Sequence, residues 1–234
     1  MLKHLFPLTL AMVFGAQAMA DETDIRKAME AKLGTKVESV TKSGYMGLYE
    51  VYADGQLLYT DEKMTTIIVG GQLIDAKTMK NITDERMKKL TAIKFSELPL
   101  ERAIKQVRGD GKRIMATFED PNCGYCKRLA KELLKLDNVT VYTFLYPILS
   151  EDSVRKSKQI WCSSDRAKAW NDWMIDGKAP AGREDCDTSA VTKNQEFGRK
   201  LNISGTPTMF FADGERVPGA MPLPRIEQKL SAAK

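Results

Sequence analysis

The chain contains 234 residues, with 36 lysines and arginines against 31 aspartates and glutamates, and its formal net charge is +5. Because charges of both signs are interleaved along the sequence, this balance indicates an ordinary solvated surface, and we expect no nucleic-acid partner. The length exceeds the roughly 100 to 150 residues of a typical domain and predicts two domains, each with a core of its own.

Residues 1–20 are typical of a secretory signal peptide. Lys3 provides a positive start, the segment from Leu5 to Ala16 is mostly apolar, and Ala18-Met19-Ala20 fits a cleavage site. A membrane anchor is the competing interpretation, but the apolar run is well below the roughly 20 residues that a span requires. We therefore expect this segment to be removed and the mature protein to be exported.

The only histidine, His4, lies within this segment. Its removal excludes from the mature chain every mechanism that needs an imidazole base or a histidine metal ligand. The four cysteines, Cys123, Cys126, Cys162 and Cys186, all follow it, and an exported protein can form disulfides. Three pairings are formally possible. The closeness of Cys123 to Cys126 favours that pair, which leaves Cys162 with Cys186.

Residues 21–82 predict a small N-terminal domain of α and β structure. A short amphipathic helix that ends at Gly34 is followed by strands, among them 48–53 and 56–60 around the turn Asp54-Gly55. Further strands are expected at 65–69 and 72–76, on either side of Gly70-Gly71. A domain of this size has a marginal core, so a partner subunit would stabilise it.

The next segment, residues 83–98, predicts a linker helix, because acidic residues open it, lysines follow, and apolar residues lie down one side. At 1.5 Å per residue this helix would span roughly 24 Å. Residues 99–234 then show the order of elements that is typical of the thioredoxin fold. The expected elements are strands 113–118 and 139–146, a helical insertion over about 150–201, a hairpin of 208–212 with 216–217, and a last helix that begins near Pro224.

Cys123-Gly124-Tyr125-Cys126 lies where strand 113–118 gives way to a helix predicted over 123–136. At a helix N-terminus the free N–H groups and the dipole stabilise a thiolate, so we predict that Cys123 is the nucleophile. Cys126, one turn later, is placed to resolve a mixed disulfide. The alternatives are an inert disulfide or half of a zinc site, but zinc needs about four ligands and no second Cys-x-x-Cys is present. We therefore expect redox activity, no metal and no cofactor.

Two carboxylates precede the motif, Glu119 and Asp120. They could assist proton transfer, but residues at a strand end before Pro121 are more often exposed turn formers, and we expect no catalytic role for them. Thioredoxin carries a buried aspartate six residues before its first cysteine, whereas this chain has Thr117 there. The way in which thioredoxin handles the proton of its second cysteine is therefore not transferable to Cys126.

The run from Phe118 to Lys127, with Cys-Gly-Tyr-Cys at its centre, resembles the active site of the DsbC family of bacterial disulfide isomerases. Ile160-Trp161-Cys162 and Ser204-Gly205-Thr206-Pro207 are also similar to that family, as is the order of signal peptide, small domain, linker helix and thioredoxin domain. This resemblance covers essentially the whole chain. It implies a thioredoxin-like α/β catalytic domain with a helical insertion, preceded by a cystatin-like α+β dimerisation domain.

The resemblance also implies roles for further residues. Thr206 and Pro207 would form a cis-proline loop that faces the Cys-x-x-Cys and binds extended substrate backbone, and Cys162 and Cys186 would form a structural disulfide. A V-shaped homodimer would have strand edges that meet near Gly70-Gly71, and would protect the cysteines from the oxidase DsbB. The implied partners are misfolded disulfide-containing proteins and the membrane reductase DsbD, in the periplasm.

The function that this resemblance implies is isomerisation of wrong disulfides, with chaperone activity as a companion. Two alternatives stay open. One is a DsbG-like reductase that protects single cysteines, against which Gly124 argues because that relative tends to carry proline there. The other is a holdase-type binding protein in which the redox site is incidental, and Cys123→Ser separates it from an enzyme.

Overall fold

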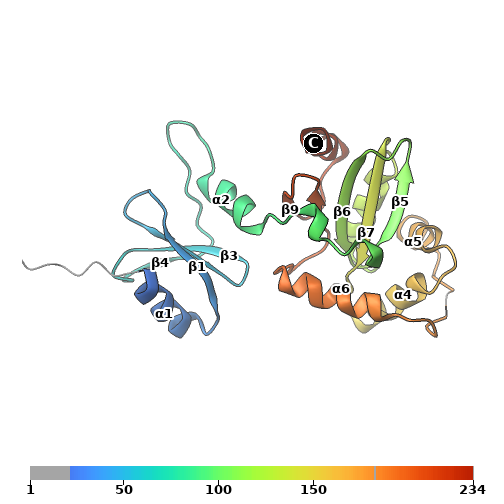
Figure 1. Ribbon diagram of the computed structural model, residues 1–234, viewed down its shortest axis with the longest axis horizontal. Coiled ribbons are helices and arrows are strands. Elements are labelled where there is room, and N and C mark those ends of the chain that lie inside the picture. Colours follow the sequence, from blue (N-terminus) through green and yellow to red (C-terminus); the bar gives the residue numbers. More distant parts are fainter. Residues whose placement is uncertain (1–21, 182, 234) are drawn as a thin grey trace, which may run out of the picture. The chain divides into compact units, whose positions relative to one another are not determined.

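The computed structural model describes residues 22–181 and 183–233, and the chain divides into two compact units after Gly71 (Figure 1). The signal peptide predicted at residues 1–20 lies outside the described residues. None of the helices in the described part of the chain combines the length and the apolar character of a membrane span. The domain limits expected at 82 and 98 stay predictions.

The first unit is a helix packed on an antiparallel sheet. Its core joins Ile25 and Met29 of the helix to Val40, Val51 and Leu58 of the sheet. The turn Asp54-Gly55 has φ values of 49° and 73°, as the hairpin signal predicts. The elements are α1 (Glu22–Leu33), β1 (Val37–Lys42), β2 (Tyr49–Ala53), β3 (Gln56–Thr60) and β4 (Ile67–Ile68), with the strands in the order β1-β2-β3-β4.

The strands of this region differ from the sequence predictions in three places. The strand expected at 65–69 shortens to β4, and the one expected at 72–76 forms only a bridge between Ile74 and Asn81. The carboxylate of Asp75 accepts hydrogen bonds of 2.9 Å from the amides of two following residues, which turns the chain back. β1 was not expected, because a bulge near Val37 breaks the alternation of its side chains.

The helix that follows, α2 (Ile82–Thr91), is shorter than the linker helix predicted at 83–98. Asn81 caps its N-terminus, where its side chain accepts a hydrogen bond of 3.0 Å from Asp84 N. After α2 the chain continues as two 3-10 turns, η1 (Phe95–Glu97) and η2 (Leu100–Arg102). The helix ends early because Phe95 and Leu98 are buried in the core of the second unit, which a straight helix would not permit.

The second unit contains a five-stranded sheet in the order β5-β7-β6-β8-β9. β6 and β7 are parallel, as the strand-helix-strand pattern predicts, and the other pairs are antiparallel. The strands are β5 (Ile104–Arg108), β6 (Arg113–Glu119), β7 (Val139–Leu145), β8 (Thr208–Phe211) and β9 (Arg216–Pro218). The helices are α3 (Gly124–Leu133), the insertion α4 (Glu151–Trp161), α5 (Arg166–Met174) and α6 (Ser189–Lys200), and the final α7 (Leu223–Ala232). This is the predicted thioredoxin order, with β5 as an addition.

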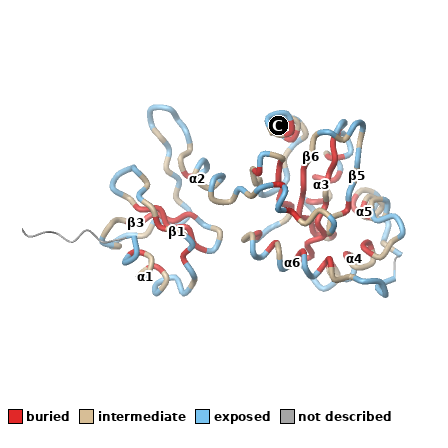
Figure 2. Tube along the Cα trace, viewed as in Figure 1, coloured by how far each residue is buried: buried red, intermediate tan, exposed pale blue. Residues whose placement is uncertain are grey.

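The central strands β6, β7 and β8 are buried on both faces and form the centre of the unit, whereas the edge strand β5 is partly exposed (Figure 2). On β6, Met115 packs with Leu129 and Leu133 of α3 and with α7, whereas Phe118 packs on the opposite side, where its ring stacks on Phe144 at 4.7 Å. Because side chains alternate along a strand, every second residue from Met115 onward faces α3. The end of β6 therefore presents its side chains to the helix that begins at the Cys-x-x-Cys.

Candidate active site

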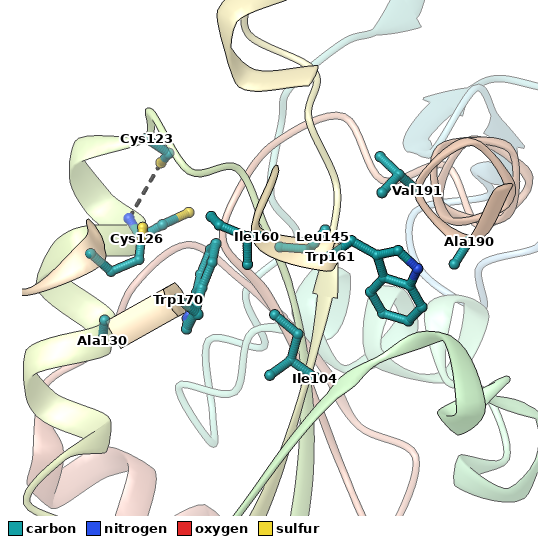
Figure 3. Packing of buried hydrophobic residues seen from close by; sticks show 11 residues of the cluster. Ile104, Cys123, Cys126, Ala130, Leu145, Ile160, Trp161, Trp170, Ala190 and Val191 are labelled. Atoms are coloured by element: carbon teal, nitrogen blue, oxygen red, sulfur yellow. Dashed lines mark hydrogen bonds between the residues drawn. The ribbon is translucent and has the colours of Figure 1, made fainter. Parts of the chain in front are cut away.

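Cys123 is the N-cap of α3, at the junction that the sequence predicts. Its sulfur accepts a hydrogen bond of 3.3 Å from the amide of Cys126, and both cysteines are free thiols (Figure 3). Cys123 is 5% exposed and Cys126 is fully buried, whereas Tyr125 between them is 61% exposed. Only the first sulfur is therefore within reach of another protein, and the exposed tyrosine ring lies next to it in the chain.

The environment of Cys123 favours the thiolate. A hydrogen bond from the Cys126 side chain, with further ones from Thr206 and from backbone amides of the first helical turn, outweighs partial burial and lowers the pKa of Cys123 from 9.0 to about 5. At neutral pH the sulfur is then ionised, and it can attack a disulfide without a separate base. A low pKa also makes the same sulfur a good leaving group.

Cys126 has the opposite character. Burial raises its pKa far above the usual range, and the hydrogen bond to Cys123 and the charge of Glu119 raise it further. Its thiol stays protonated while Cys123 is a thiolate. The two sulfurs are thus differentiated into an accessible nucleophile and a buried thiol that needs a proton acceptor before it can react.

The loop that contains Thr206 and Pro207 lies against the first sulfur. The peptide bond between these two residues is cis, and the carbonyl of Thr206 accepts a hydrogen bond of 3.3 Å from the Cys123 thiol. That bond requires the protonated thiol, so it is lost when Cys123 ionises. The structure therefore brings Cys123, Cys126 and Thr206 together.

The two cysteines lie at one end of an apolar cluster, where Cys126 is isolated from water (Figure 3). Ile160 and Trp170 lie nearest to the cysteines, and Trp161 lies at the far end of the cluster. The cluster is built largely by the helical insertion, with Ile160 and Trp161 from α4 and Trp170 from α5, and Leu145 from the end of β7 completes it. Among the described residues, the insertion supplies most of the large side chains of this cluster. The insertion thus lowers the local polarity around the buried thiol, which explains the direction of its pKa shift.

Glu119 and Asp120 are fully buried, so the expectation that they are exposed turn residues is wrong. β6 continues through Glu119, whose carbonyl accepts a hydrogen bond of 2.8 Å from Tyr146 N, and the strand end is covered rather than exposed. The carboxylate of Asp120 accepts hydrogen bonds from the amides of Asn122, Ile148 and Leu149 at 2.8 to 2.9 Å. Sequence reasoning gave no sign of this network, because two of its donors, Ile148 and Leu149, come from a loop 28 and 29 residues later in the chain.

Trp173 lies beside Pro121, two residues before Cys123. Its indole nitrogen donates a hydrogen bond of 2.6 Å to the carbonyl of Pro121, and the ammonium groups of Lys127 and Lys156 lie 4.2 and 4.7 Å from the centre of its ring. These contacts hold α5 against the start of α3 and combine cation–π attraction with a hydrogen bond. They also place positive charge at the rim of the site.

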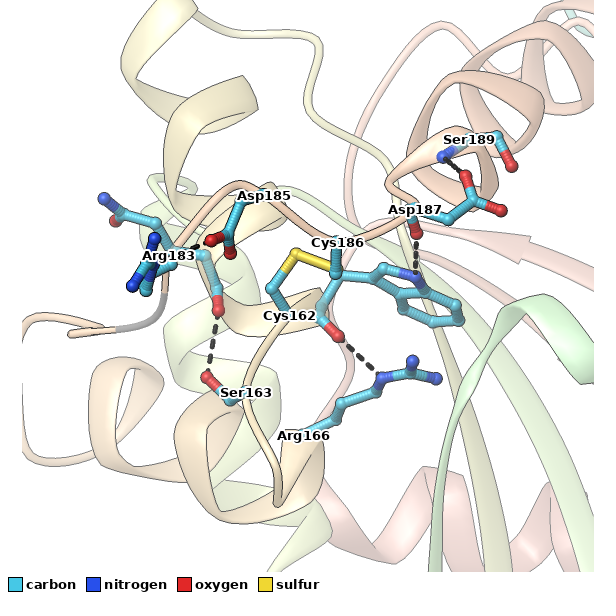
Figure 4. Close-up of a disulfide and its surroundings, with 10 residues drawn as sticks. Cys162, Ser163, Arg166, Arg183, Asp185, Cys186, Asp187 and Ser189 are labelled. Carbon is cyan, nitrogen blue, oxygen red and sulfur yellow. Dashed lines mark hydrogen bonds and ion pairs between the residues drawn. A yellow bond between two sulfur atoms is a disulfide. The ribbon is translucent and has the colours of Figure 1, made fainter.

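Cys162 and Cys186 form a disulfide with Cα atoms 5.6 Å apart and a sequence separation of 24 (Figure 4). Cys162 is the C-cap of α4, and Cys186 lies shortly before α6. The neighbouring Trp161 donates a hydrogen bond of 3.1 Å from its indole nitrogen to the carbonyl of Asp187. This bridge therefore holds the insertion that covers the cysteines, and it takes no part in the Cys123–Cys126 pair.

The remaining residues singled out by the sequence lie outside the thiol site. Gly70 and Gly71 belong to the first unit, shortly after β4, and their expected role at a dimer interface stays a prediction. Over residues 22–181 and 183–233, no group of three or more histidine, cysteine, aspartate or glutamate side chains is arranged to hold a metal ion.

Comparison with known proteins gives matches along the chain. The profile of the thioredoxin-like domain family matches residues 100–234, and that of the disulfide bond isomerase N-terminal domain matches residues 16–84. A protein of Bordetella pertussis named probable thiol:disulfide interchange protein DsbC is 50% identical over 217 residues, which cover 92% of this chain and 76% of that protein.

Two further relatives are also named disulfide interchange proteins. The thiol:disulfide interchange protein DsbC of Escherichia coli is 28% identical over 236 residues, with 98% of this chain and 96% of that protein covered. The crystal structure of a disulfide interchange protein from Neisseria gonorrhoeae superimposes with a TM-score of 0.56 at 43% identity, and covers 58% of this chain and 98% of that one. The fold is therefore thioredoxin-like, with helices and a sheet, in the second unit.

Proposed function

The chain belongs to the DsbC family of thiol:disulfide interchange proteins, and on that premise we propose that Cys123 and Cys126 reshuffle wrong disulfides in other proteins. The protein is a thiol-disulfide oxidoreductase of the isomerase class. The observation that carries the assignment of Cys123 is its position as the N-cap of α3, where its pKa falls to about 5 beside a buried thiol partner.

The first step uses the Cys123 thiolate. It attacks one sulfur of a substrate disulfide, a bond forms between the two sulfurs, and the second substrate sulfur leaves as a thiolate that takes a proton from water. A different substrate thiolate then attacks the mixed disulfide. This releases Cys123 as a thiolate and leaves a new substrate disulfide, so no electrons are transferred overall.

Cys126 resolves a mixed disulfide that no second substrate thiolate attacks. Cys126 attacks the sulfur of Cys123, the substrate leaves with a free thiol, and the two enzyme cysteines become a disulfide. The substrate has then gained two electrons from the enzyme. A dithiol reductant must return them, and by family membership we propose a DsbD-like membrane reductase for this role.

We further propose that Thr206 and Pro207 bind the substrate backbone and that Tyr125, with Gly124, forms part of the surface that contacts it. Support comes from the 3.3 Å contact between the Thr206 carbonyl and the Cys123 sulfur, and from the exposure of the Tyr125 ring. An extended substrate segment beside this loop would present its cysteine to the Cys123 thiolate.

We also propose that the protein works in the periplasm, that it forms a homodimer and that it has chaperone activity. The expected signal peptide and the redox chemistry support the periplasm, and membership of the family supports a homodimer formed by the first unit near Gly70-Gly71. Exposed apolar side chains in that unit, such as Met46 and Val69, support binding of misfolded proteins. The Cys123→Ser variant should keep this binding, which suppression of substrate aggregation measures.

Refolding of a scrambled multi-disulfide protein in a glutathione buffer tests the main assignment. Wild type should restore the native pairing, Cys123→Ser should lose this activity, and Cys126→Ser should retain part of it because the first attack is intact. Recovery that is undiminished in Cys123→Ser would contradict the assignment. Net oxidation without reshuffling by the wild type would contradict the isomerase activity itself.

A further inference from the structure

Glu119 is a buried carboxylate for which the fold provides no hydrogen-bond partner. The residue is fully buried, and neither carboxylate oxygen has a partner among the described residues. The hydroxyl of Thr117, two residues earlier on the same strand face, makes no hydrogen bond of ordinary length and angle either, although it lies close enough to the carboxylate to lower its pKa. Buried polar groups are nearly always paired, so an isolated carboxylate calls for a functional explanation.

The register of the sheet places this carboxylate beneath the active-site helix. Met115, on the same face of β6, packs against α3, and the alternation of side chains carries that row through Thr117 to Glu119. Leu145, which pairs with Glu119 across the parallel ladder, lies in one cluster with Cys123 and Cys126. Glu119 therefore points toward the first turn of α3, where both sulfurs lie.

We infer that Glu119 takes the proton from Cys126 when the mixed disulfide is resolved, and returns it when the enzyme is reduced again. The inference rests on the proposed function, because it assigns one step of the same reaction. The proton moves directly or through one water molecule. Glu119 acts on the reaction through Cys126 and does not contact the substrate.

The electrostatics of the free enzyme agree with this role. Burial, with a smaller contribution from the negative charge of the Cys123 thiolate, outweighs the lowering effect of the nearby Thr117 and raises the pKa of Glu119 to about 8. When Cys123 enters a mixed disulfide, that charge disappears and Glu119 ionises more readily. The thiol of Cys126 also loses the thiolate to which it donated a hydrogen bond. The base thus becomes available at the step that requires it.

The other charged groups near the site are engaged elsewhere. Asp120 points to the opposite side of the strand, where it accepts a hydrogen bond of 2.7 Å from Ser153. Lys127 of α3 and Lys156 of α4 lie against the ring of Trp173. From β7, the partner of Glu119 is the apolar Leu145. The titratable groups that act on Glu119 are therefore the two cysteines.

Resolution of a mixed disulfide begins with the loss of the Cys126 proton. The proton of Cys126 passes to the Glu119 carboxylate, and the Cys126 sulfur attacks the sulfur of Cys123. The Cys123–Cys126 bond forms while the bond from Cys123 to the substrate sulfur breaks, and the substrate leaves as a thiolate. The substrate thiolate takes a proton from water, and two electrons from the cysteine pair have passed to the substrate. Glu119 holds the proton of Cys126 until reduction of the Cys123–Cys126 disulfide returns it.

Reaction of the reduced full-length protein with dithiobis(nitrobenzoic acid) separates the two attacks. Attack by Cys123 releases one coloured thionitrobenzoate, and attack by Cys126 on the resulting mixed disulfide releases a second. Both phases are followed by stopped-flow absorbance across a range of pH. In Glu119→Gln the first phase should keep its rate, which also shows that the variant is folded. The second phase should slow roughly a hundredfold at neutral pH, at the lower end of the contribution of a general base.

Three further variants test whether the effect is specific to the carboxylate of Glu119. Glu119→Asp should recover part of the second rate, and Thr117→Val should move the pH midpoint of the second phase upward, because a group that lowers the pKa of Glu119 is removed. Glu50→Gln, a buried carboxylate of the first unit, should leave both phases unchanged. A second phase in Glu119→Gln with the rate and pH profile of the wild type would overturn the inference. A first phase that persists in Cys123→Ser would instead overturn the proposed function.

Discussion

The hydroxyl of Ser153, in the first turn of α4, donates a hydrogen bond of 2.7 Å to the buried carboxylate of Asp120, three residues before Cys123. The same carboxylate accepts hydrogen bonds from the backbone amides of Ile148 and Leu149. Asp120 thus ties the end of β6 to the start of the helical insertion. The position of the insertion over the cysteines depends on a side chain that is adjacent to the motif in sequence.

Asp120→Asn should destabilise the protein by roughly 2 to 4 kcal/mol, because an amide nitrogen would then face backbone N–H groups that need an acceptor. Urea unfolding measures the change. The matched control is Asp165→Asn, at the exposed N-cap of α5, where the carboxylate accepts from Lys168 N and asparagine caps as well as aspartate. Equal stability of Asp120→Asn and the control would show that the network is not required for folding.

The hydrogen bond from the Cys126 thiol is the largest cause of the low pKa of Cys123. Cys126→Ala should therefore raise the pKa of Cys123 from about 5, whereas Cys126→Ser should raise it less, because a hydroxyl still donates. The ultraviolet absorbance of the thiolate as a function of pH measures both values. Identical titrations of the two variants would show that the amide of Cys126 stabilises the thiolate without help from its side chain.

The same shift makes the stability of the reduced protein depend on pH. Because the folded-state pKa of Cys123 lies below its ordinary value of 9.0, ionisation stabilises the folded state at pH 9 and above. This stabilisation is lost as the pH falls toward about 5. The stability advantage of reduced wild type over Cys123→Ser should therefore shrink between these two pH values. Urea unfolding at several pH values measures it, and an advantage that does not vary with pH would contradict the shifted pKa.

The elements that local sequence specifies were predictable, and those set by distant contacts were not. β6, α3 and β7 follow from apolar runs and from the Cys123–Cys126 spacing, and the structure has them within a few residues of their predicted limits. β5 was missed because it is an edge strand whose exposure alternates but whose residue types do not: the apolar Val107 is 53% exposed, while the more buried positions 106 and 108 carry polar side chains. The burial of Glu119 was missed because it depends on the covering helices and on the parallel pairing with β7.

The Cys162–Cys186 disulfide should stabilise the protein by restricting the unfolded chain. A closed loop of this size contributes about 3 kcal/mol, so the double variant Cys162→Ser with Cys186→Ser should lose about that much in urea unfolding without reductant. With a reductant that opens the bridge, wild type and variant should unfold alike, which is the control. Equal stability without reductant would show that the loop does not restrict the unfolded chain.

The proposed dimer interface near Gly70-Gly71 can be tested at one exposed side chain. β4 pairs with β3 on one side, and Val69, directly after it, is 65% exposed. A charge at this position would have to be buried without a partner in the dimer, so Val69→Asp should give monomers.

Sedimentation of the full-length protein measures the oligomeric state, and the matched control is Val107→Asp. Val107 is 53% exposed on β5, the edge strand of the other sheet, so its replacement adds the same charge to a comparable surface. The control should stay dimeric. If Val69→Asp also sediments as a dimer, the interface lies away from β4; if both variants are monomers, the effect comes from added charge and not from the position. Because the resemblance to the DsbC family implies that the dimer protects the cysteines from the oxidase DsbB, monomers of Val69→Asp should also be oxidised faster than wild type.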